Sequence, residues 1–241
     1  MAFKKLKQFL RKRKLSRCGI KVDVDIPTAV YGDRSGYWTV APEFLLPQSI
    51  VYSVGVGNNI AWDLAMIDRH HVDIYAFDPT PRSVAWIGSQ ALPSRFKFHP
   101  IGLSDQDGQM AFAVPKREGK FNYRASAFST ETQTIFCEVK TLSSLRKLVG
   151  RVEIDVLKLD IEGAEMLVLR ELDDLKPLPG QLLVEFHYHY PGISFDAFVQ
   201  VVTALRSAGY RIFHISERGY EFSLIHERLL SNSAQISENV A

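Results

Sequence analysis

The chain has 241 residues, of which 46% are hydrophobic and 23% charged, so it can bury a sizeable core and wholesale disorder is excluded. Eight Lys and Arg and no acid lie within the first 17 residues, which leaves 21 basic and 27 acidic side chains in the remainder. That acidic body argues against nucleic acid as the main partner, because phosphate binding needs a basic surface. Cys18 and Cys137 form neither a disulfide framework nor a zinc ligand set.

Residues 2–15 have the pattern of a short basic amphipathic helix, with Phe3, Leu6, Phe9 and Leu10 at helical spacing. One interpretation is weak contact with an anionic membrane, and the other is a solvated, frayed terminus. We favour the terminus, because so short a helix has little stability in isolation. No apolar run spans a bilayer or follows the basic residues as in a secretory signal. We therefore expect a cytoplasmic protein, with peripheral membrane contact as the alternative.

Residues 16–48 are punctuated by Pro and Gly and predict an irregular segment that wraps the domain edge. After it, strands and helices alternate. The expected strands cover 50–54, 72–77, 96–99, 154–159, 181–186, 210–215 and 220–226, with added strands at 109–114 and 135–139. The expected helices cover 59–70, 80–90, 141–149, 164–172 and 195–208.

This alternation predicts an α/β protein, a doubly wound, mostly parallel sheet with helices on both faces. Only four residues separate the strand at 210–215 from the one at 220–226. The connection has room only for a hairpin, so the sheet closes with an antiparallel pair at its C-terminal end. Ligands of such sheets bind outside the carboxyl ends of the strands.

Two short segments are expected at that edge. Gly55 and Gly57 follow the first strand, and two glycines let the backbone turn sharply and approach a ligand closely. Asp78 ends the second strand, 23 residues after Gly55. A carboxylate there can accept both hydroxyls of an adenosine ribose, although it can also cap the helix that follows. We favour the ribose role.

A third segment at this edge, residues 155–165, brings several carboxylates, among them Asp160 and Glu162. These acids decide between two nucleotide cofactors. NAD carries a pyrophosphate that acids repel, whereas S-adenosylmethionine carries a sulfonium and an ammonium that acids attract. The sequence therefore favours S-adenosylmethionine. Glu165 is explained as an acid that complements a helix dipole.

An acceptor that loses a proton during group transfer needs a base, and the candidates are Asp160, Glu162 and His187. In an extended chain Glu185, His187 and His189 point the same way. That arrangement suits a base with its orienting partner, or a metal site of two His and one carboxylate. The third interpretation is an ordinary polar loop. We rank the base first and predict no metal.

Residues 115–131 interrupt the alternation with basic and aromatic side chains. An acceptor-binding lid and a solvated β-hairpin explain this segment equally well.

Four motifs resemble the FkbM-type methyltransferases, which are class I enzymes that use S-adenosylmethionine. They are VGVGNNI at 54–60, FDPTP at 77–81, GLSDQDG at 102–108 and DVLKLDIEGAE at 155–165. The resemblance implies a Rossmann-like seven-stranded sheet with strand order 3-2-1-4-5-7-6. Gly55 and Gly57 would face the methionine part, Asp78 the ribose, Leu103 and Ser104 the adenine, and Asp160 the methyl donor.

Two residues depart from the class I pattern. Ser53 stands where many members carry an acid, and Asn59 replaces a commoner glycine at the cofactor turn. Asp160 or Glu162 would then bind the ammonium group.

The sequence thus predicts an S-adenosylmethionine-dependent methyltransferase that methylates a hydroxyl on a sugar, a glycan or a secondary metabolite. The alternatives are a non-catalytic nucleoside-cofactor-binding or membrane-docked module, and a nicotinamide-dependent oxidoreductase. We expect a basic extension at 1–17, a wrapping segment at 18–48, the class I methyltransferase domain at 49–230 and a tail at 231–241.

Overall fold

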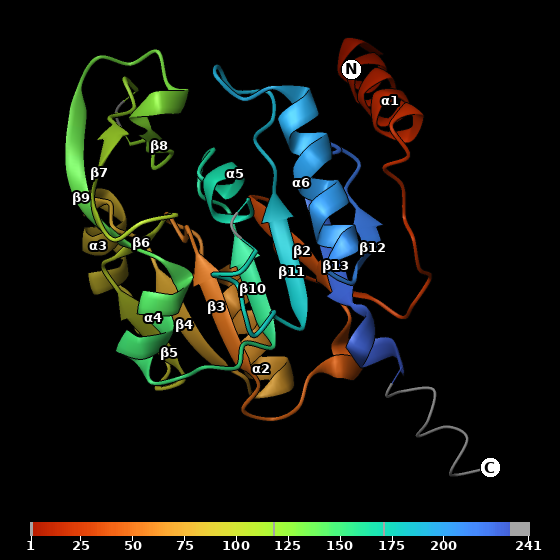
Figure 1. The fold of residues 1–241 in the computed structure, drawn as a ribbon. Coiled ribbons are helices and arrows are strands. Elements are labelled where there is room, and N and C mark those ends of the chain that lie inside the picture. The colour runs from red at the N-terminus through yellow and green to blue at the C-terminus, as the bar shows by residue number, and fades with distance from the viewer. Residues whose placement is uncertain (1, 118, 171, 232–241) are drawn as a thin grey trace.

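The computed structural model describes residues 2–117, 119–170 and 172–231. A seven-stranded sheet lies at the centre of the fold (Figure 1). Its strands run in the order β12 (Tyr210–Ile215), β13 (Glu221–His226), β11 (Gln181–Glu185), β10 (Val156–Leu159), β3 (Ile50–Val54), β4 (Asp73–Phe77) and β5 (Phe96–His99). Strands β11, β10, β3, β4 and β5 pair in parallel, whereas β13 is antiparallel to both of its neighbours. The expected α/β class is confirmed, and the carboxyl ends of five strands share one edge.

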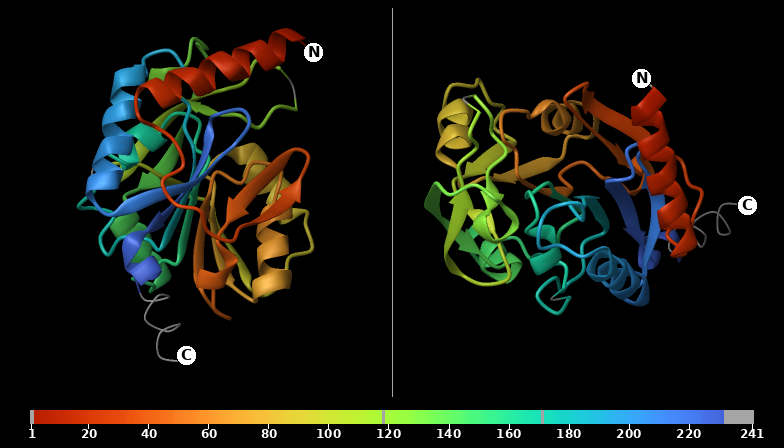
Figure 2. Two further views of the ribbon diagram at one scale, coloured as in Figure 1. Left: turned by 90° about the vertical axis from the view of Figure 1, so that its right-hand side faces the viewer. Right: turned by 90° about the horizontal axis from the view of Figure 1, so that it is seen from above.

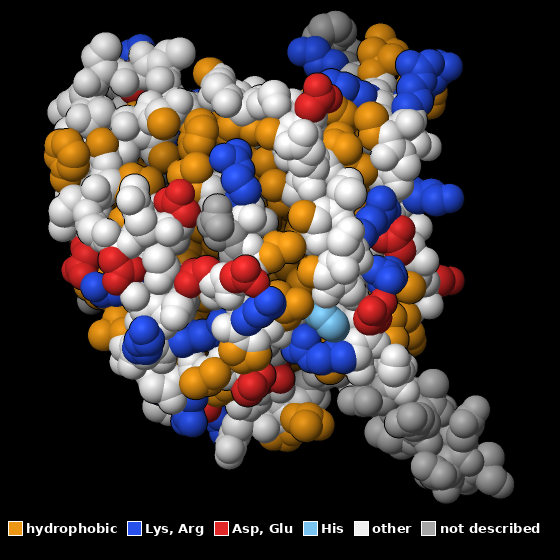
Figure 3. All heavy atoms as spheres, in the orientation of Figure 1, with side chains coloured by type: hydrophobic (Ala, Val, Ile, Leu, Met, Phe, Trp, Pro, Cys, Tyr) orange, Lys and Arg blue, Asp and Glu red, His pale blue; other side chains and the backbone are white. Residues whose placement is uncertain are grey.

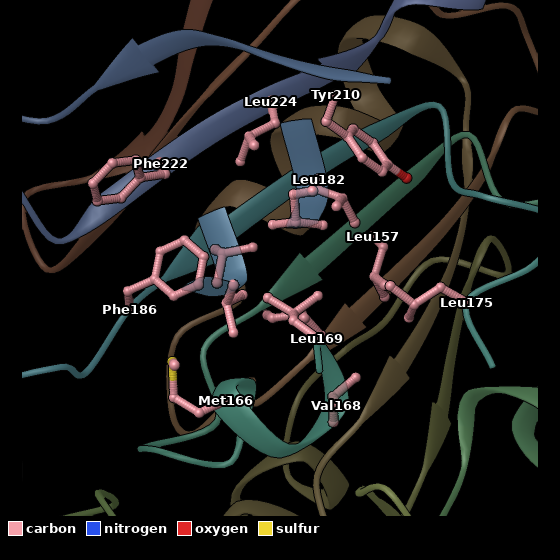
Figure 4. Close-up of a cluster of buried hydrophobic side chains, with 14 of the residues drawn as sticks. Leu157, Met166, Val168, Leu169, Leu175, Leu182, Phe186, Tyr210, Phe222 and Leu224 are labelled. Carbon is pink, nitrogen blue, oxygen red and sulfur yellow. The ribbon is translucent and has the colours of Figure 1, made fainter. Parts of the chain in front are cut away.

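Helices cover both faces of this sheet. On one face lie α4 (Leu142–Val149), α5 (Glu165–Val168) and α6 (Phe195–Ser207), and on the other α2 (Ala61–His70) and α3 (Pro81–Gly88). Successive residues of a strand point to opposite faces, so Leu157 joins the first buried cluster and Val156 the second. Figure 4 shows Leu157 beside Leu182 of the neighbouring strand, facing Leu169 after α5. Truncation of such a leucine to alanine costs about 2–5 kcal/mol.

A second, four-stranded sheet lies beside the carboxyl edge of the first. Its order is β6 (Gly102–Leu103), β9 (Thr134–Lys140), β7 (Gly108–Ala113) and β8 (Arg124–Ala125), and a 3-10 turn, η2 (Ser126–Phe128), follows β8. Strands β7 and β9 are the two added strands that the sequence predicts, and they pair antiparallel. The residues between β7 and β8 therefore run over the top of β3 and β4.

The wrapping segment is more ordered than expected. It forms a β-hairpin of β1 (Ala29–Asp33) and β2 (Gly36–Val40), followed by a 3-10 turn, η1 (Pro42–Phe44). Trp38 and Val40 are buried against the second cluster. The expectation of irregular structure here was wrong, because the prolines lie outside the hairpin and the turn 33–36 closes it.

The N-terminal helix also differs from the favoured expectation. Helix α1 (Ala2–Arg17) is not a frayed terminus, since Leu15 is buried and the helix lies along the top of the molecule (Figure 2). Its inner side packs on the loop that joins β12 to β13 and on the start of α6. Within the described residues, every helix is too short or too polar to span a bilayer.

The five expected helices are all shorter than predicted, and α5 differs most. Helix α2 begins at Ala61, whose backbone N–H donates to the side chain of Asn59. Helix α5 covers only four residues: it begins one residue later than expected, after a tight turn in which Glu162 and Gly163 adopt positive φ angles, and it ends at Val168. The proposed division into extension, wrapping segment, domain and tail stays a prediction, and residues 232–241 of that tail lie outside the described residues.

Candidate active site

A cavity of about 240 Å³ lies above the carboxyl ends of β3, β4 and β10. Asp78 and Asp160 both line it, as do Gly55 and Gly57. The three segments that the sequence places at this edge therefore meet around one space. None of the described residues that line the cavity is Lys or Arg. Its polar character is therefore that of acids, amides and backbone.

Gly55 makes the close approach of these segments possible. Its φ is +80°, and a Cβ atom there would lie 1.8 Å from the carbonyl oxygen of Asp160. The Gly55 N–H donates to the carbonyl of Phe77, and the Asp160 N–H donates to that of Val54. These hydrogen bonds hold the turn after β3 against the ends of β4 and β10. No space remains for a side chain at Gly55.

Asp78 accepts hydrogen bonds from both sides of the cavity edge, while its ribose role stays a prediction. One carboxylate oxygen accepts from the Gly57 N–H at 2.9 Å, and the other from the N–H and hydroxyl of Thr80 at 2.9 and 2.7 Å. It therefore holds the glycine turn and the chain entering α3. A carboxylate offers about four acceptor positions, so one remains for a ligand without rearrangement.

Asn59 lies at the rim of the cavity and connects it to the N-terminal hairpin. Its amide nitrogen donates to Asp33 at 2.9 Å and to the Ser35 hydroxyl at 3.0 Å. Hydrogen bonds from Ser35 and Asn59 lower the pKa of Asp33 to about 2. Ser35 itself lines the cavity. The sequence analysis missed this contribution, whose signal is the Asp-Arg-Ser-Gly turn between two runs of β-forming residues.

Leu103 and Ser104 differ in their relation to the cavity. Leu103 lines it from β6. Ser104 is buried, and its hydroxyl donates to Asp105 at 3.0 Å. It is not among the described residues that line the cavity. Of these two residues, the geometry therefore supports only Leu103 as a contact of a bound cofactor.

The segment 115–131 closes the cavity from above. Phe121, Asn122 and Tyr123 line it, and Arg82 of α3 donates to the carbonyl of Lys120. Among the described residues of this segment only Arg124 and Ala125 pair as a strand, and they do not form the solvated hairpin of the second interpretation. Phe121 and Tyr123 are among the aromatic side chains that suggested a lid from sequence, whereas Asn122 was not singled out.

An acidic cluster lies beside the cavity and is centred on His187. The His187 Nδ1 atom is 2.8 Å from a carboxylate oxygen of Glu165, which also accepts the N–H groups of Ile161 and Gly163. The Nε2 atom lies 3.8 to 4.0 Å from oxygens of Glu185, Glu162 and Asp160. Glu165 is fully buried. It therefore orients the imidazole, a role beyond that of a helix N-terminal acid.

The charges of this cluster shift the pKa values of its members. Burial alone would lower the pKa of His187, but Glu165, Asp160 and Glu162 raise it to about 10. Burial, with the charge of Glu162, raises the pKa of Asp160 to about 6. Burial, with the charge of Asp160, raises that of Glu185. At neutral pH His187 is therefore an imidazolium, which cannot accept a proton.

Glu162 and Asp160 differ in how strongly they are held. Glu162 accepts short hydrogen bonds from Asn122 and the Tyr190 hydroxyl, and Arg124 lies 3.7 Å away. No hydrogen bond reaches the Asp160 carboxylate within the part of the chain that the structure describes. Asp160 is thus the freer of the two carboxylates.

His189 does not join His187 and Glu185. Strand β11 ends at Glu185, and the Tyr190 N–H donates to the His187 carbonyl, so the chain turns instead of staying extended. The His189 ring stacks on Tyr220, and burial lowers its pKa to about 4. The three side chains whose ligand atoms do converge, within 4.8 Å, are Asp160, Glu185 and His187.

A second hollow of about 740 Å³ opens on the other side of Asp160. Glu185, Arg218 and Trp38 line it, together with Arg11 from helix α1. Arg218 forms an ion pair with Glu185 at 2.9 Å. Asp160 borders both spaces, so a group bound in one cavity can face a group bound in the other across this residue.

Comparisons with known proteins identify the family of this chain. A family model described as a methyltransferase FkbM domain matches residues 30–212. The rat and human proteins described as probable methyltransferase-like protein 24 are 26% and 25% identical to the chain over 76% and 69% of its length. Only 46% and 42% of those relatives are covered, so the chain spans less than half their length.

Among solved structures, the fibrillarin pre-rRNA processing protein of Methanococcus jannaschii superimposes with a TM-score of 0.48 at 13% identity. That match covers 90% of this chain and 76% of the other. Fibrillarin of Aeropyrum pernix, solved with bound S-adenosyl-L-methionine, gives a TM-score of 0.40 at 12% identity over 76% of this chain and 66% of that one.

Proposed function

Because the chain belongs to the FkbM methyltransferase family, as its motifs predict, we propose that it transfers the methyl group of S-adenosylmethionine to a hydroxyl group. The acceptor we propose is a sugar, a glycan or a secondary metabolite. The observation that carries this proposal is the cavity shared by Asp78 and Asp160, which no described Lys or Arg lines. Such a cavity favours a cofactor with a sulfonium and an ammonium over one with a pyrophosphate.

The two hollows suit a transfer between two bound molecules. We place the cofactor in the first cavity, with its ribose toward Asp78 and its methyl group toward Asp160, and the acceptor in the second. When bound, S-adenosylmethionine supplies an electrophilic methyl group. The protein then contributes mainly by holding the acceptor oxygen in line with it. Phe121 and Tyr123 cover the first cavity and limit the access of water.

Asp160 is the base that this geometry favours. His187 already carries a proton at neutral pH, and Glu162 is engaged by Asn122 and Tyr190. Asp160 borders the acceptor cavity, and its raised pKa makes it a stronger base than an ordinary aspartate. The acceptor hydroxyl would lose its proton to Asp160 as the methyl group is transferred.

The test is calorimetry with S-adenosylmethionine and with NAD, followed by transfer of labelled methyl groups to hydroxylated acceptors. We expect the first compound to bind and NAD not to bind. Binding of NAD alone would favour an oxidoreductase. Binding of S-adenosylmethionine without turnover on sugars, glycans, metabolites or RNA would favour the non-catalytic module.

A further inference from the structure

Helix α1 is attached to the body by one of its faces. The Arg11 guanidinium stacks on Tyr220 at 3.8 Å, the Lys14 ammonium lies 3.7 Å from the Phe195 ring centre, and Leu15 is buried. Arg11 also donates to the carbonyl of Arg218. These three residues are spaced i, i+3, i+4, so they form one face of the helix.

The opposite face of α1 is apolar and exposed. Leu6, Phe9 and Leu10 share the same i, i+3, i+4 spacing and are 52%, 61% and 53% exposed. At about 100° per residue, this face points about 140° away from the attached one. Exposed Lys5 and Lys12 border this face on one side, and exposed Arg13 and Arg17 continue it toward the end of the helix. Figure 3 shows basic and hydrophobic side chains side by side on this projecting helix.

We propose that α1 docks the protein on an anionic membrane surface. Apolar side chains flanked by Lys and Arg are typical of helices that lie in the interface of anionic lipids. Nucleic acid would engage the same charges, but it would leave Leu6, Phe9 and Leu10 in water. Peripheral docking requires no membrane-spanning helix.

Docking would bring the acceptor cavity close to the lipid. Lys7, Gln8 and Arg11 of α1 line the second hollow, so α1 separates that space from the membrane by about one helix diameter, roughly 10 Å. An acceptor hydroxyl carried by a membrane-bound molecule could then reach Asp160. This consequence rests on the proposed function, whereas the docking itself does not.

The test is co-sedimentation of the full chain with vesicles of phosphatidylcholine, with and without phosphatidylserine. We expect binding to the anionic vesicles that weakens with salt. The variant Leu6→Ser/Phe9→Ser/Leu10→Ser should bind at least about tenfold more weakly. Replacement of Lys5, Lys12 and Arg13 by Gln should weaken binding by roughly fivefold for each charge.

The matched control is Phe136→Ser/Leu148→Ser/Val152→Ser, which removes three exposed apolar side chains from other parts of the surface. It should bind vesicles as the wild type does. Circular dichroism and S-adenosylmethionine calorimetry check that each variant is folded. Absence of binding to anionic vesicles, or equal binding by the two triple-serine variants, would overturn the proposal. So would an affinity for single-stranded RNA that exceeds the affinity for lipid.

Each of the two proposals can be rejected without rejecting the other. Vesicle binding without S-adenosylmethionine binding would reject the methyltransferase function and leave the docking in place. Binding of S-adenosylmethionine without vesicle binding would reject the docking and leave the proposed methyltransferase function in place.

Discussion

Gly55 occupies a position that no side chain can share, since a Cβ atom would lie 1.8 Å from the Asp160 carbonyl oxygen. We expect Gly55→Ala to shift the glycine turn, to lower stability by about 1–3 kcal/mol and to weaken S-adenosylmethionine binding more than about tenfold. The matched change is Gly57→Ala, where φ is +55° but the nearest atom is 3.8 Å away. It should cost only about 1–2 kcal/mol. Thermal unfolding measures the stability of each variant, and calorimetry measures its affinity for S-adenosylmethionine. Equal effects of Gly55→Ala and Gly57→Ala would contradict this explanation.

Asp160 carries the second prediction for a single residue. Because we assign it as the base, Asp160→Asn should lower kcat by about 10²–10⁴-fold, and the wild-type rate should fall as the pH drops below about 6. The control is Glu217→Gln, which removes a different acid from the lining of the same hollow. A rate that is insensitive to pH between 5 and 7.5 would rule Asp160 out. Steady-state kinetics across this range measure how the rate depends on pH.

The N-terminal hairpin gives a prediction for an element. It reaches the cavity rim through the bonds of Asn59 to Asp33 and Ser35. We expect Asn59→Ala and Asp33→Ala each to weaken cofactor binding several-fold and to expose residues 29–40 to limited proteolysis. Because both remove the bond between Asn59 and Asp33, the loss in the double variant should be smaller than the sum of the two single losses. Additive losses would show that the two residues act independently.

The whole molecule should lose stability as the pH rises. His187 has a pKa of about 10 in the folded protein, against about 6.5 in an unfolded chain. Its stabilising contribution is therefore complete below about pH 6.5 and disappears as the pH rises to 10. The raised pKa values of Asp160 and Glu185 act in the same direction. The melting temperature should fall over this range, and His187→Gln should flatten the dependence; a parallel curve for that variant would contradict the assignment.

Local patterns in the sequence were sufficient to predict the strands of the seven-stranded sheet. Alternating apolar runs predict β3, β4, β5, β10 and β11, and the short connection after residue 215 predicts the antiparallel end. Strand ends and glycine spacing predict Gly55, Asp78 and Asp160 at one edge. These predictions succeed because a parallel sheet places every strand's carboxyl end on the same side.

Contacts between distant segments could not be predicted from these patterns. Asn59 meets Asp33 across 26 residues, and Glu165 meets His187 across 22. The charge that weighs against His187 as the base could not be predicted from sequence for the same reason. The pKa of His187 is raised by three carboxylates, those of Glu165, Asp160 and Glu162, and only folding brings these charges to the imidazole.

The sequence by itself determined the fold class, the family and the acidic character of the cofactor edge, because these follow from periodicity and from residue type at strand ends. Only the tertiary structure decided which acid is free, which histidine is protonated, and that α1 turns one apolar face outward. Those properties depend on distance, burial and the direction of side chains, which chain order does not specify.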